Sequence, residues 1–271
     1  MPTQAEKALA FRALHARPGA FIIPNPWDPG TARLLQQEGF DALATTSAGY
    51  AFSVGRRDNQ IDRAEMLTHV RTIVEASDLP VSADLENGYG DDPSTVAETY
   101  RLAADTGLAG ASIEDATQRT DEPLYEIAHA AERVQAAVEA VRSLPFPFTL
   151  TARAENFLVG QPDLKDAIKR LQAYQNAGAD VLYAPGLTRP EDIAAVVSSV
   201  DRPVNVVMGL RGAQLSLANL SALGVKRVSI GSALARAAFG AFLRAAHEMR
   251  EHGTFSFAND AVPFAEITQR F

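Results

Sequence analysis

Short hydrophobic runs alternate with longer stretches of helical periodicity along most of the chain. The eight runs begin near Phe21, Ala42, Val81, Gly110, Phe148, Val181, Val204 and Arg227. Between them, stretches such as 93–106, 162–177 and 190–200 carry apolar residues at helical spacing and open with a proline, which is a common helix start. Alternating strands and helices predict a parallel sheet. Eight repeats predict a closed (β/α)8 barrel of the TIM type.

Residues 1–271 are expected to form one such barrel domain. A chain of 271 residues has a usual length for this fold, and no low-complexity linker divides it. Leu9, Phe11 and Leu14 fall on one face of a predicted N-terminal helix that precedes the first strand. An open doubly wound sheet is the alternative. It often carries a Gly-x-Gly-x-x-Gly turn after its first strand, and that turn is missing from this sequence.

The composition excludes several classes of protein. Because the chain has no cysteine, it cannot form disulfides, cysteine zinc sites or a thiol nucleophile. A net charge of -8 argues against a nucleic-acid-binding surface, which needs clustered lysine and arginine. No run approaches the ~18 apolar residues of a membrane span, and Glu6, Lys7 and Arg12 interrupt the N-terminal stretch where a signal peptide would be apolar. We therefore expect a cytoplasmic protein with no nucleic-acid or membrane partner.

Acidic residues follow two neighbouring runs of the predicted barrel. Asp84 and Glu86 end the third run, where strand alternation sends both side chains to the same side, and Glu114 ends the fourth. Strand ends share one mouth in a barrel, and three carboxylates crowded there repel one another unless a cation lies among them. Oxygen-only ligands favour Mg2+ or Mn2+. In the alternative interpretation, these acids cap helices and pair with surface bases.

Two further strand ends offer groups that bind anions. Arg153 ends the fifth run, where its guanidinium would present a fixed positive fork to a carboxylate or a developing oxyanion. Alternatively, Arg153 forms a structural bridge to Glu155 or Glu114. The second run ends in small residues that expose backbone N–H groups and one hydroxyl, which is a reasonable carboxylate cradle. These residues are Thr46, Ser47, Ala48 and Gly49.

Histidine chemistry is not expected. None of the five histidines follows a strand, and four of them fall within clearly helical stretches, so we expect surface or interface positions. They are His15, His69, His129, His247 and His252.

Five segments, taken together and in this order, resemble the isocitrate lyase/phosphoenolpyruvate mutase superfamily. They are 46–49 (TSAG), 55–58 (GRRD), 83–90 (ADLENGYG), 113–115 (IED) and 152–155 (ARAE). The resemblance covers nearly the whole predicted barrel, from about Phe21 to Gly231. It implies a Mg2+-dependent enzyme that stabilises the enolate of a 2-oxo acid while a C–C or P–C bond forms or breaks.

The resemblance also implies roles for individual residues. Asp84 would be the direct metal ligand, and the water shell of the metal would be held by Asp58, Glu86 and Glu114. Ser47 and the backbone that follows it would hold the substrate carboxylate, while Arg153 would face the enolate oxygen. Members of the superfamily commonly form homotetramers in which the last helix is exchanged between neighbours. The apolar stretch 233–246 is compatible with such an exchanged C-terminal helix.

The sequence departs from the superfamily at two places. Isocitrate and methylisocitrate lyases carry a cysteine loop after the fourth strand, whereas this chain has only the short segment 116–123 and no cysteine. The mutase and phosphonopyruvate hydrolase branches have a histidine near the end of the sixth strand, where this chain reads Tyr183-Ala184-Pro185-Gly186. The proton donor is therefore unassigned. Tyr50, Tyr89 and Tyr183 are candidates, and we name Tyr50 as the catalytic residue to test.

The function predicted from these features is that of a Mg2+-dependent carbon–carbon lyase. Its substrate would be a small 2-oxo or 2-hydroxy di-acid, cleaved or decarboxylated through an enolate. One alternative is a phosphonate enzyme of the phosphoenolpyruvate mutase or phosphonopyruvate hydrolase type. Another is a protein that binds 2-oxo acids without turning them over.

Overall fold

The computed structural model describes residues 2–210, 212 and 215–271. Within them, eight parallel strands form one sheet in the order β1-β8-β7-β6-β5-β4-β3-β2. A single backbone bond from the Ala44 N–H to the Pro24 carbonyl (3.0 Å) links the edge near β1 to β2, so the barrel is nearly closed. The predicted (β/α)8 barrel is confirmed. The strands are β1 (Phe21–Ile23), β2 (Leu43–Ala44), β3 (Val81–Asp84), β4 (Gly110–Glu114), β5 (Thr149–Arg153), β6 (Val181–Tyr183), β7 (Val204–Val207) and β8 (Arg227–Ser229).

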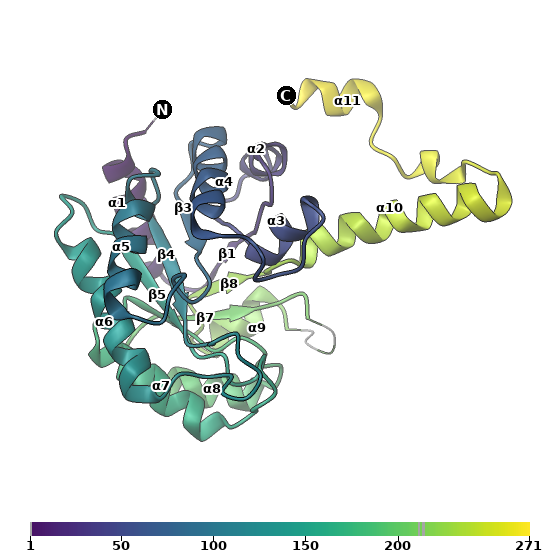
Figure 1. Cartoon of the computed structure of the whole chain (residues 1–271). Coiled ribbons are helices and arrows are strands. Elements are labelled where there is room, and N and C mark those ends of the chain that lie inside the picture. The colour runs from purple at the N-terminus through teal and green to yellow at the C-terminus, as the bar shows by residue number, and fades with distance from the viewer. Residues whose placement is uncertain (1, 211, 213–214) are drawn as a thin grey trace.

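Helices follow the strands as the periodicity predicted (Figure 1). Several begin at residues whose side chains accept backbone N–H groups, such as Thr3 before α1 and Asp62 before α4. The α-helices are α1 (Gln4–Ala16), α2 (Pro29–Gln37), α3 (Ser47–Ser53), α4 (Arg63–Ala76), α5 (Pro93–Ala104), α6 (Ile127–Arg142), α7 (Leu164–Asn176), α8 (Pro190–Ser198), α9 (Leu217–Ala222), α10 (Ala233–His252) and α11 (Phe264–Gln269).

The interior of the barrel is unusually polar for this fold, in which branched aliphatic side chains commonly fill the centre. Arg227 on β8 crosses the interior. Its Nε donates to Asn205 Oδ1 and its Nη2 donates to Thr151 Oγ1, both at 2.9 Å. The apolar core instead lies between the sheet and the surrounding helices, where residues such as Ile113 and Val206 are buried.

Two histidines are buried within the chain, which corrects the expectation that they occupy surface or interface positions. His15 on α1 packs edge-on against the rings of Phe11 and Phe21, and its Nε2 lies 3.5 Å from Arg227 Nη1. His69 on α4 stacks on the Tyr50 ring at a centroid distance of 3.7 Å. Burial lowers the pKa of His15 to about 3 and that of His69 to about 4, so both rings are neutral at pH 7.

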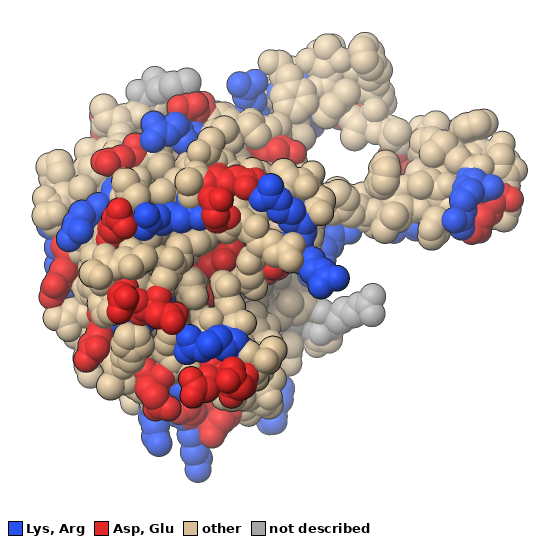
Figure 2. All heavy atoms as spheres, in the orientation of Figure 1, with Lys and Arg blue, Asp and Glu red and all other residues tan. Residues whose placement is uncertain are grey.

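The C-terminal segment leaves the barrel. Figure 1 shows α10 extending away from it and α11 lying beyond a turn. Large apolar side chains along this segment are exposed, among them Phe242 (68%) and Phe264 (85%). Figure 2 shows that most of its visible surface is uncharged. Among the helices of the described residues, none combines the length and the apolar character that crossing a membrane requires.

Candidate active site at the barrel mouth

A cavity of about 390 Å³ opens at the C-terminal ends of the strands. Most of the residues singled out from the sequence lie along its wall, although they come from five different strand ends and loops. The predicted site residues that line it are Thr46, Ser47, Ala48, Asp58, Asp84, Glu114 and Arg153. Gly49, Tyr50 and Glu86 do not belong to this lining. Most of the residues predicted from the sequence therefore lie around one cavity, and the other three lie outside its wall.

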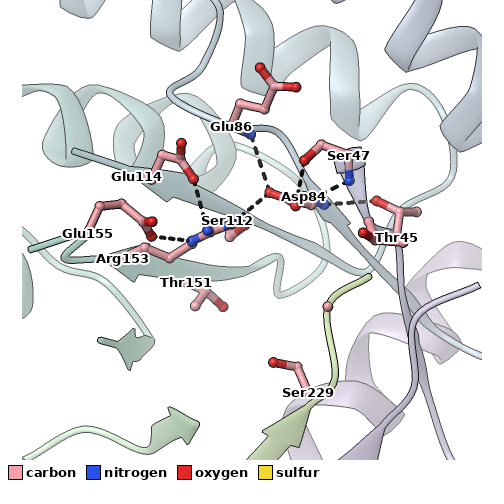
Figure 3. Close-up of polar contacts among 12 residues, drawn as sticks. Thr45, Ser47, Asp84, Glu86, Ser112, Glu114, Thr151, Arg153, Glu155 and Ser229 are labelled. Atoms are coloured by element: carbon pink, nitrogen blue, oxygen red, sulfur yellow. Dashed lines mark hydrogen bonds and ion pairs between the residues drawn. The ribbon is translucent and has the colours of Figure 1, made fainter. Parts of the chain in front are cut away.

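Arg153 lies at the centre of the acidic residues (Figure 3). Sheet register places Arg153 directly beside Glu114 on the neighbouring strand. Its Nη1 donates to Asp84 Oδ1 at 2.8 Å and its Nη2 lies 3.0 Å from Glu114 Oε2. Its Nε donates to Glu155 Oε1 at 2.8 Å. The guanidinium thus binds three carboxylates at once. Arg153 therefore both bridges its acidic neighbours and lies at the mouth of the barrel.

Burial governs the charges of this cluster. Glu114 and Glu155 lose hydration on burial, which raises the pKa of each carboxyl even though Arg153 favours the ionised form. Burial alone would lower the pKa of Arg153, but Glu155, Glu114 and Asp84 raise it well above its ordinary value. Arg153 therefore remains a guanidinium cation, and the local excess of acids favours binding of a further cation or of protons.

Ser47 and Asp58 form the opposite part of the wall. Ser47 Oγ lies 3.1 Å from both Asp58 Oδ1 and Asp84 Oδ2, and the Ser47 N–H donates to Asp84 Oδ2 at 3.3 Å. Ser47 is the first residue of α3, and Thr46 caps this helix by accepting the Gly49 N–H at 3.1 Å. The predicted cradle is therefore a helix start. Gly49 allows the Thr46 side chain to pack closely against the start of the helix, since a Cβ at position 49 would lie 2.5 Å from Thr46 Cγ2.

Glu86 does not share the orientation of Asp84, which corrects the alternation argument. The strand β3 ends at Asp84, and Glu86 has a left-handed φ of 51°. In Figure 3 its carboxylate points away from Asp84. Its Oε2 accepts Gln118 Nε2 at 3.2 Å, while its buried Oε1 has no hydrogen-bond partner. Burial, helped by Asp84 and Asp58, raises the pKa of Glu86 to about 8.

The donor set suits a hard cation bound largely through water. Among the described residues, no three carboxylates or histidines converge closely enough to hold a metal by direct contact alone. Mg2+ characteristically takes one or two protein carboxylates and keeps several waters. Asp84 as the direct ligand, with Asp58, Glu86 and Glu114 reached through water, fits this preference. The unpartnered buried Oε1 of Glu86 is the kind of acceptor that such a water would satisfy.

The three candidate tyrosines differ in their access to the cavity. The Tyr50 hydroxyl contacts Glu65 at 3.4 Å, outside the cavity wall, so the structure does not bring Tyr50 to the site. The Tyr89 hydroxyl is buried without a hydrogen-bond partner. Tyr183 lines the cavity, and its ring lies under Arg153 with the guanidinium carbon 5.3 Å from the ring centroid. Burial raises the pKa of Tyr183 to about 12, so its hydroxyl is protonated at pH 7. Tyr183 is thus the tyrosine whose position suits a proton donor.

Several residues of the cavity are not among those predicted from the sequence. Glu155, predicted as a bridging partner of Arg153, also lines the cavity, and Asp115 fixes its backbone by accepting the Glu155 N–H at 2.8 Å. Arg170 in turn donates to Asp115 at 3.1 Å. Counting back two residues from a predicted strand end would have found other inward positions, because strand side chains alternate. The additional polar lining residues include Asn25, Ser82, Ser112, Asn205, Arg227 and Ser229.

Comparison with known proteins identifies several similar proteins. A Burkholderia cenocepacia J2315 protein of known structure, provisionally described as a lyase/mutase, is 66% identical, with a TM-score of 0.96 over 98% of this chain and 95% of its own. The 2-methylisocitrate lyase of Bacillus subtilis (strain 168) is 29% identical over 209 residues, which are 74% of this chain and 67% of that enzyme. The structure of 2,3-dimethylmalate lyase is 27% identical, with a TM-score of 0.86 over 100% of this chain and 95% of its own.

The match to a family profile extends over most of the barrel. The profile described as phosphoenolpyruvate phosphomutase covers residues 11–250, from α1 to the later part of α10. The 2,3-dimethylmalate lyase is itself described as a member of the PEP mutase/isocitrate lyase superfamily. The resemblance inferred from the five sequence segments is thereby confirmed. The chain belongs to the phosphoenolpyruvate phosphomutase family of the isocitrate lyase/phosphoenolpyruvate mutase superfamily of enzymes.

Proposed function

We propose that this protein is a Mg2+-dependent carbon–carbon lyase that cleaves a small 2-oxo or 2-hydroxy di-acid through an enolate. The observation that carries the proposal is the arrangement around Arg153, whose guanidinium meets Asp84, Glu114 and Glu155 at the wall of the cavity. A fixed cation among acids that also suit Mg2+ places positive charge where an oxyanion would develop. Such preorganised charge lowers the barrier because it needs no rearrangement during the reaction.

Each part of the wall has a separate task in this proposal. Ser47, at the start of α3, presents its hydroxyl and the helix N-terminus, which favours a carboxylate. Arg153 faces the oxygen that becomes negative as the C–C bond breaks. The three acids around Arg153 hold its fork in one orientation, so little conformational freedom is lost when the substrate binds. When bound, Mg2+ or Mn2+ supplies Lewis-acid stabilisation of the same negative charge.

The relatives support carbon–carbon lysis over the alternatives. The names 2-methylisocitrate lyase and 2,3-dimethylmalate lyase denote lyases of hydroxy acids with several carboxylates. The cavity of about 390 Å³ accommodates a small di-acid. Tyr183 is the proton donor that we propose for the enolate carbon, because it lines the cavity and its hydroxyl is protonated at pH 7. The family name itself favours one second candidate, phosphonate P–C chemistry.

Steady-state assays with and without Mg2+ test the proposal. The substrate panel contains 2-hydroxy di-acids, 2-oxo di-acids and phosphonopyruvate, and product analysis identifies the bond that breaks. We expect Mg2+-dependent C–C cleavage of at least one di-acid. Turnover of phosphonopyruvate alone would favour the second candidate. Mg2+-dependent ligand binding with no turnover of any compound would identify a binding protein and contradict the lyase.

We also propose that the protein is a homotetramer that exchanges α10 between neighbouring copies. Phe242 and Leu243 on α10, and Phe264 on α11, are exposed apolar side chains that a second copy would cover. Monomeric proteins seldom expose so many large apolar side chains along one segment. Light scattering at several protein concentrations, with Phe242→Glu as the disrupting variant, measures this. A wild-type protein that remains monomeric at micromolar concentration would contradict the exchange.

A further inference from the structure

A second cavity lies at the opposite end of the barrel from the acidic mouth. Its volume is about 470 Å³, and it is lined by the N-terminal ends of β5 and β6, the approach to β7, α1 and the end of α6. None of the residues assigned to the proposed lyase chemistry lies along this wall. The cavity therefore needs an explanation of its own, independent of the proposed function.

Three arginines from separate elements meet at this cavity. Arg12 lies on α1, Arg142 in the last turn of α6, and Arg202 just before β7. In the described part of the chain, none of the three forms an ion pair within 4.0 Å. The chain as a whole carries a net charge of -8, so a cavity bordered by three unpaired guanidinium groups is a local reversal of charge.

One acid in the same cavity, Asp180, interacts with all three arginines and offsets part of their positive charge. Asp180 lines the wall, and its Oδ2 accepts the backbone N–H of Leu150 at 2.8 Å. This hydrogen bond holds the carboxylate at the start of β5, and the single negative charge is smaller than the summed charge of the three arginines. Three positive groups and one negative group leave a net positive site with donors still available, because a guanidinium carries five N–H groups.

The cavity also has a fixed shape and an apolar side. Arg142 lies over Gly178, where a Cβ would come within 2.6 Å of Arg142 Nη2, so the absence of a side chain at 178 makes room for the guanidinium. Val141, Phe146 and Phe148 line the same space. A ligand that fits this wall therefore combines an anionic group with an apolar body.

We infer that this cavity is a second binding site, for a small organic anion that carries a phosphate or carboxylate group on an apolar body. The anion would accept charge-assisted hydrogen bonds from Arg12, Arg142 and Arg202. The apolar body would lie against Val141, Phe146 and Phe148. Arginine suits both kinds of oxyanion because its planar fork matches either geometry. The site is separate from the mouth, and His15 and Arg227 form part of the wall between the two cavities.

A structural role is the competing explanation. Arg142 lies in the last turn of α6, where a cation stabilises the exposed carbonyls of a helix end. In that case the arginines would contribute to stability without binding a ligand. Melting temperature and ligand affinity, measured on the same variants, separate these two roles.

Isothermal titration calorimetry in metal-free buffer of low ionic strength tests the site. The probes are phenyl phosphate, phthalate and inorganic phosphate, and the first two distinguish a phosphate from a carboxylate source. The test variant is Arg142→Gln/Arg202→Gln. The matched control, Arg33→Gln/Arg71→Gln, removes two exposed arginines that lie outside the cavity. Arg153→Gln is included to detect binding at the mouth.

We expect phenyl phosphate or phthalate to bind the wild-type chain, and phenyl phosphate to bind about tenfold more tightly than inorganic phosphate, because the ring gains apolar burial. The Arg142→Gln/Arg202→Gln variant should bind at least about tenfold more weakly, since two charge-assisted bonds are lost. The control and Arg153→Gln should bind as the wild type does. If both aromatic probes fail to bind the wild-type chain, or if the test variant binds them as tightly as the wild type does, the site is overturned. Loss of binding in Arg153→Gln would assign it to the mouth instead.

Discussion

At the mouth of the barrel a single guanidinium, that of Arg153, is held by three carboxylates, whereas at the opposite end three arginines share a cavity with one aspartate. The charges of the mouth are mostly buried and hydrogen-bonded, whereas the arginines of the opposite end are exposed and form no ion pair within 4.0 Å among the described residues. A buried charge is tolerated only with partners, so each charge at the mouth depends on its neighbours. Substitutions at the mouth should therefore change stability and activity strongly, and their effects should not be additive. Substitutions at the other end should change stability only slightly, and their effects should be additive.

The largest expected effect is that of Arg153→Lys on turnover. A point charge on a flexible stem cannot reproduce the planar fork that contacts Asp84, Glu114 and Glu155. Removal of one oxyanion donor typically costs ~10²–10³ in turnover, and we expect a loss of this size with affinity for 2-oxo acids within about tenfold of wild type. Steady-state kinetics and calorimetry measure the two quantities. Arg63→Lys is the control, since Arg63 pairs with exposed Glu98.

A different outcome would give Arg153 a different role. If Arg153→Lys has both a lower melting temperature and a lower activity than the wild type, Arg153 is a structural bridge. If a well-folded variant retains full turnover, Arg153 takes no part in the chemistry.

The next largest effect is the loss of metal binding in Asp84→Ala. Removal of an outer-shell partner commonly costs 10–100-fold in metal affinity, and a direct ligand should cost at least about 100-fold. Titration with Mg2+ or Mn2+ followed by calorimetry measures it. Asp92→Ala is the control, because Asp92 is exposed and forms no side-chain cap bond with α5. Equal Mg2+ affinity in wild type and Asp84→Ala would remove Asp84 from the metal site.

A smaller effect should appear in the pH dependence of stability of Glu86→Gln without metal. The folded pKa of Glu86 is raised to about 8 from an ordinary value of 4.5. The folded state therefore binds more protons between these values, and wild-type stability falls as pH rises through this window. Glu86→Gln avoids this loss and should melt higher than wild type at pH 8 but similarly at pH 5. For a chain of this size, a change of about 1 kcal/mol in the free energy of unfolding shifts the melting temperature by roughly 2–4 °C. A variant that melts lower than wild type at pH 8 would contradict the assignment.

The smallest effect is expected at the loop after β4. Gln118 is exposed, and its Nε2 donates to Glu86 Oε2 and to Asn59 Oδ1, each at 3.2 Å. A bond of this kind contributes about 0.5–1.5 kcal/mol, so Gln118→Ala should raise KM by less than about tenfold and leave the melting temperature unchanged. Steady-state kinetics with the best substrate measures KM. A loss of turnover as large as that of Arg153→Lys would place Gln118 in the chemistry.

The sequence predicted the barrel because parallel strands buried on both faces read as short hydrophobic runs. It also located the mouth, since strand ends in a barrel face one opening. The error at Glu86 has a local cause. The alternation rule holds only while the chain stays extended, and β3 ends two residues before Glu86, whose φ is positive. Gly88, two residues further on, also has a positive φ.

Contacts between distant parts of the chain could not be predicted in the same way. Arg227 meets Thr151 and His15, which are 76 and 212 residues away. No periodicity marks such pairs, because each side chain alone fits an ordinary strand or helix position. The three arginines of the second cavity escaped for the same reason, since each lies on a different element.

Stabilisation of an enolate at the mouth in the presence of Mg2+ can be measured by hydrogen exchange. In D2O, proton NMR follows loss of the C3 hydrogens of pyruvate and 2-oxobutyrate, with buffer and Mg2+ alone as the blank. We predict exchange by the wild-type chain with Mg2+ that is well above the blank, is lost without metal, and falls by about 10²-fold or more in Arg153→Lys. Folded, Mg2+-loaded protein that exchanges neither compound faster than the blank would contradict the account.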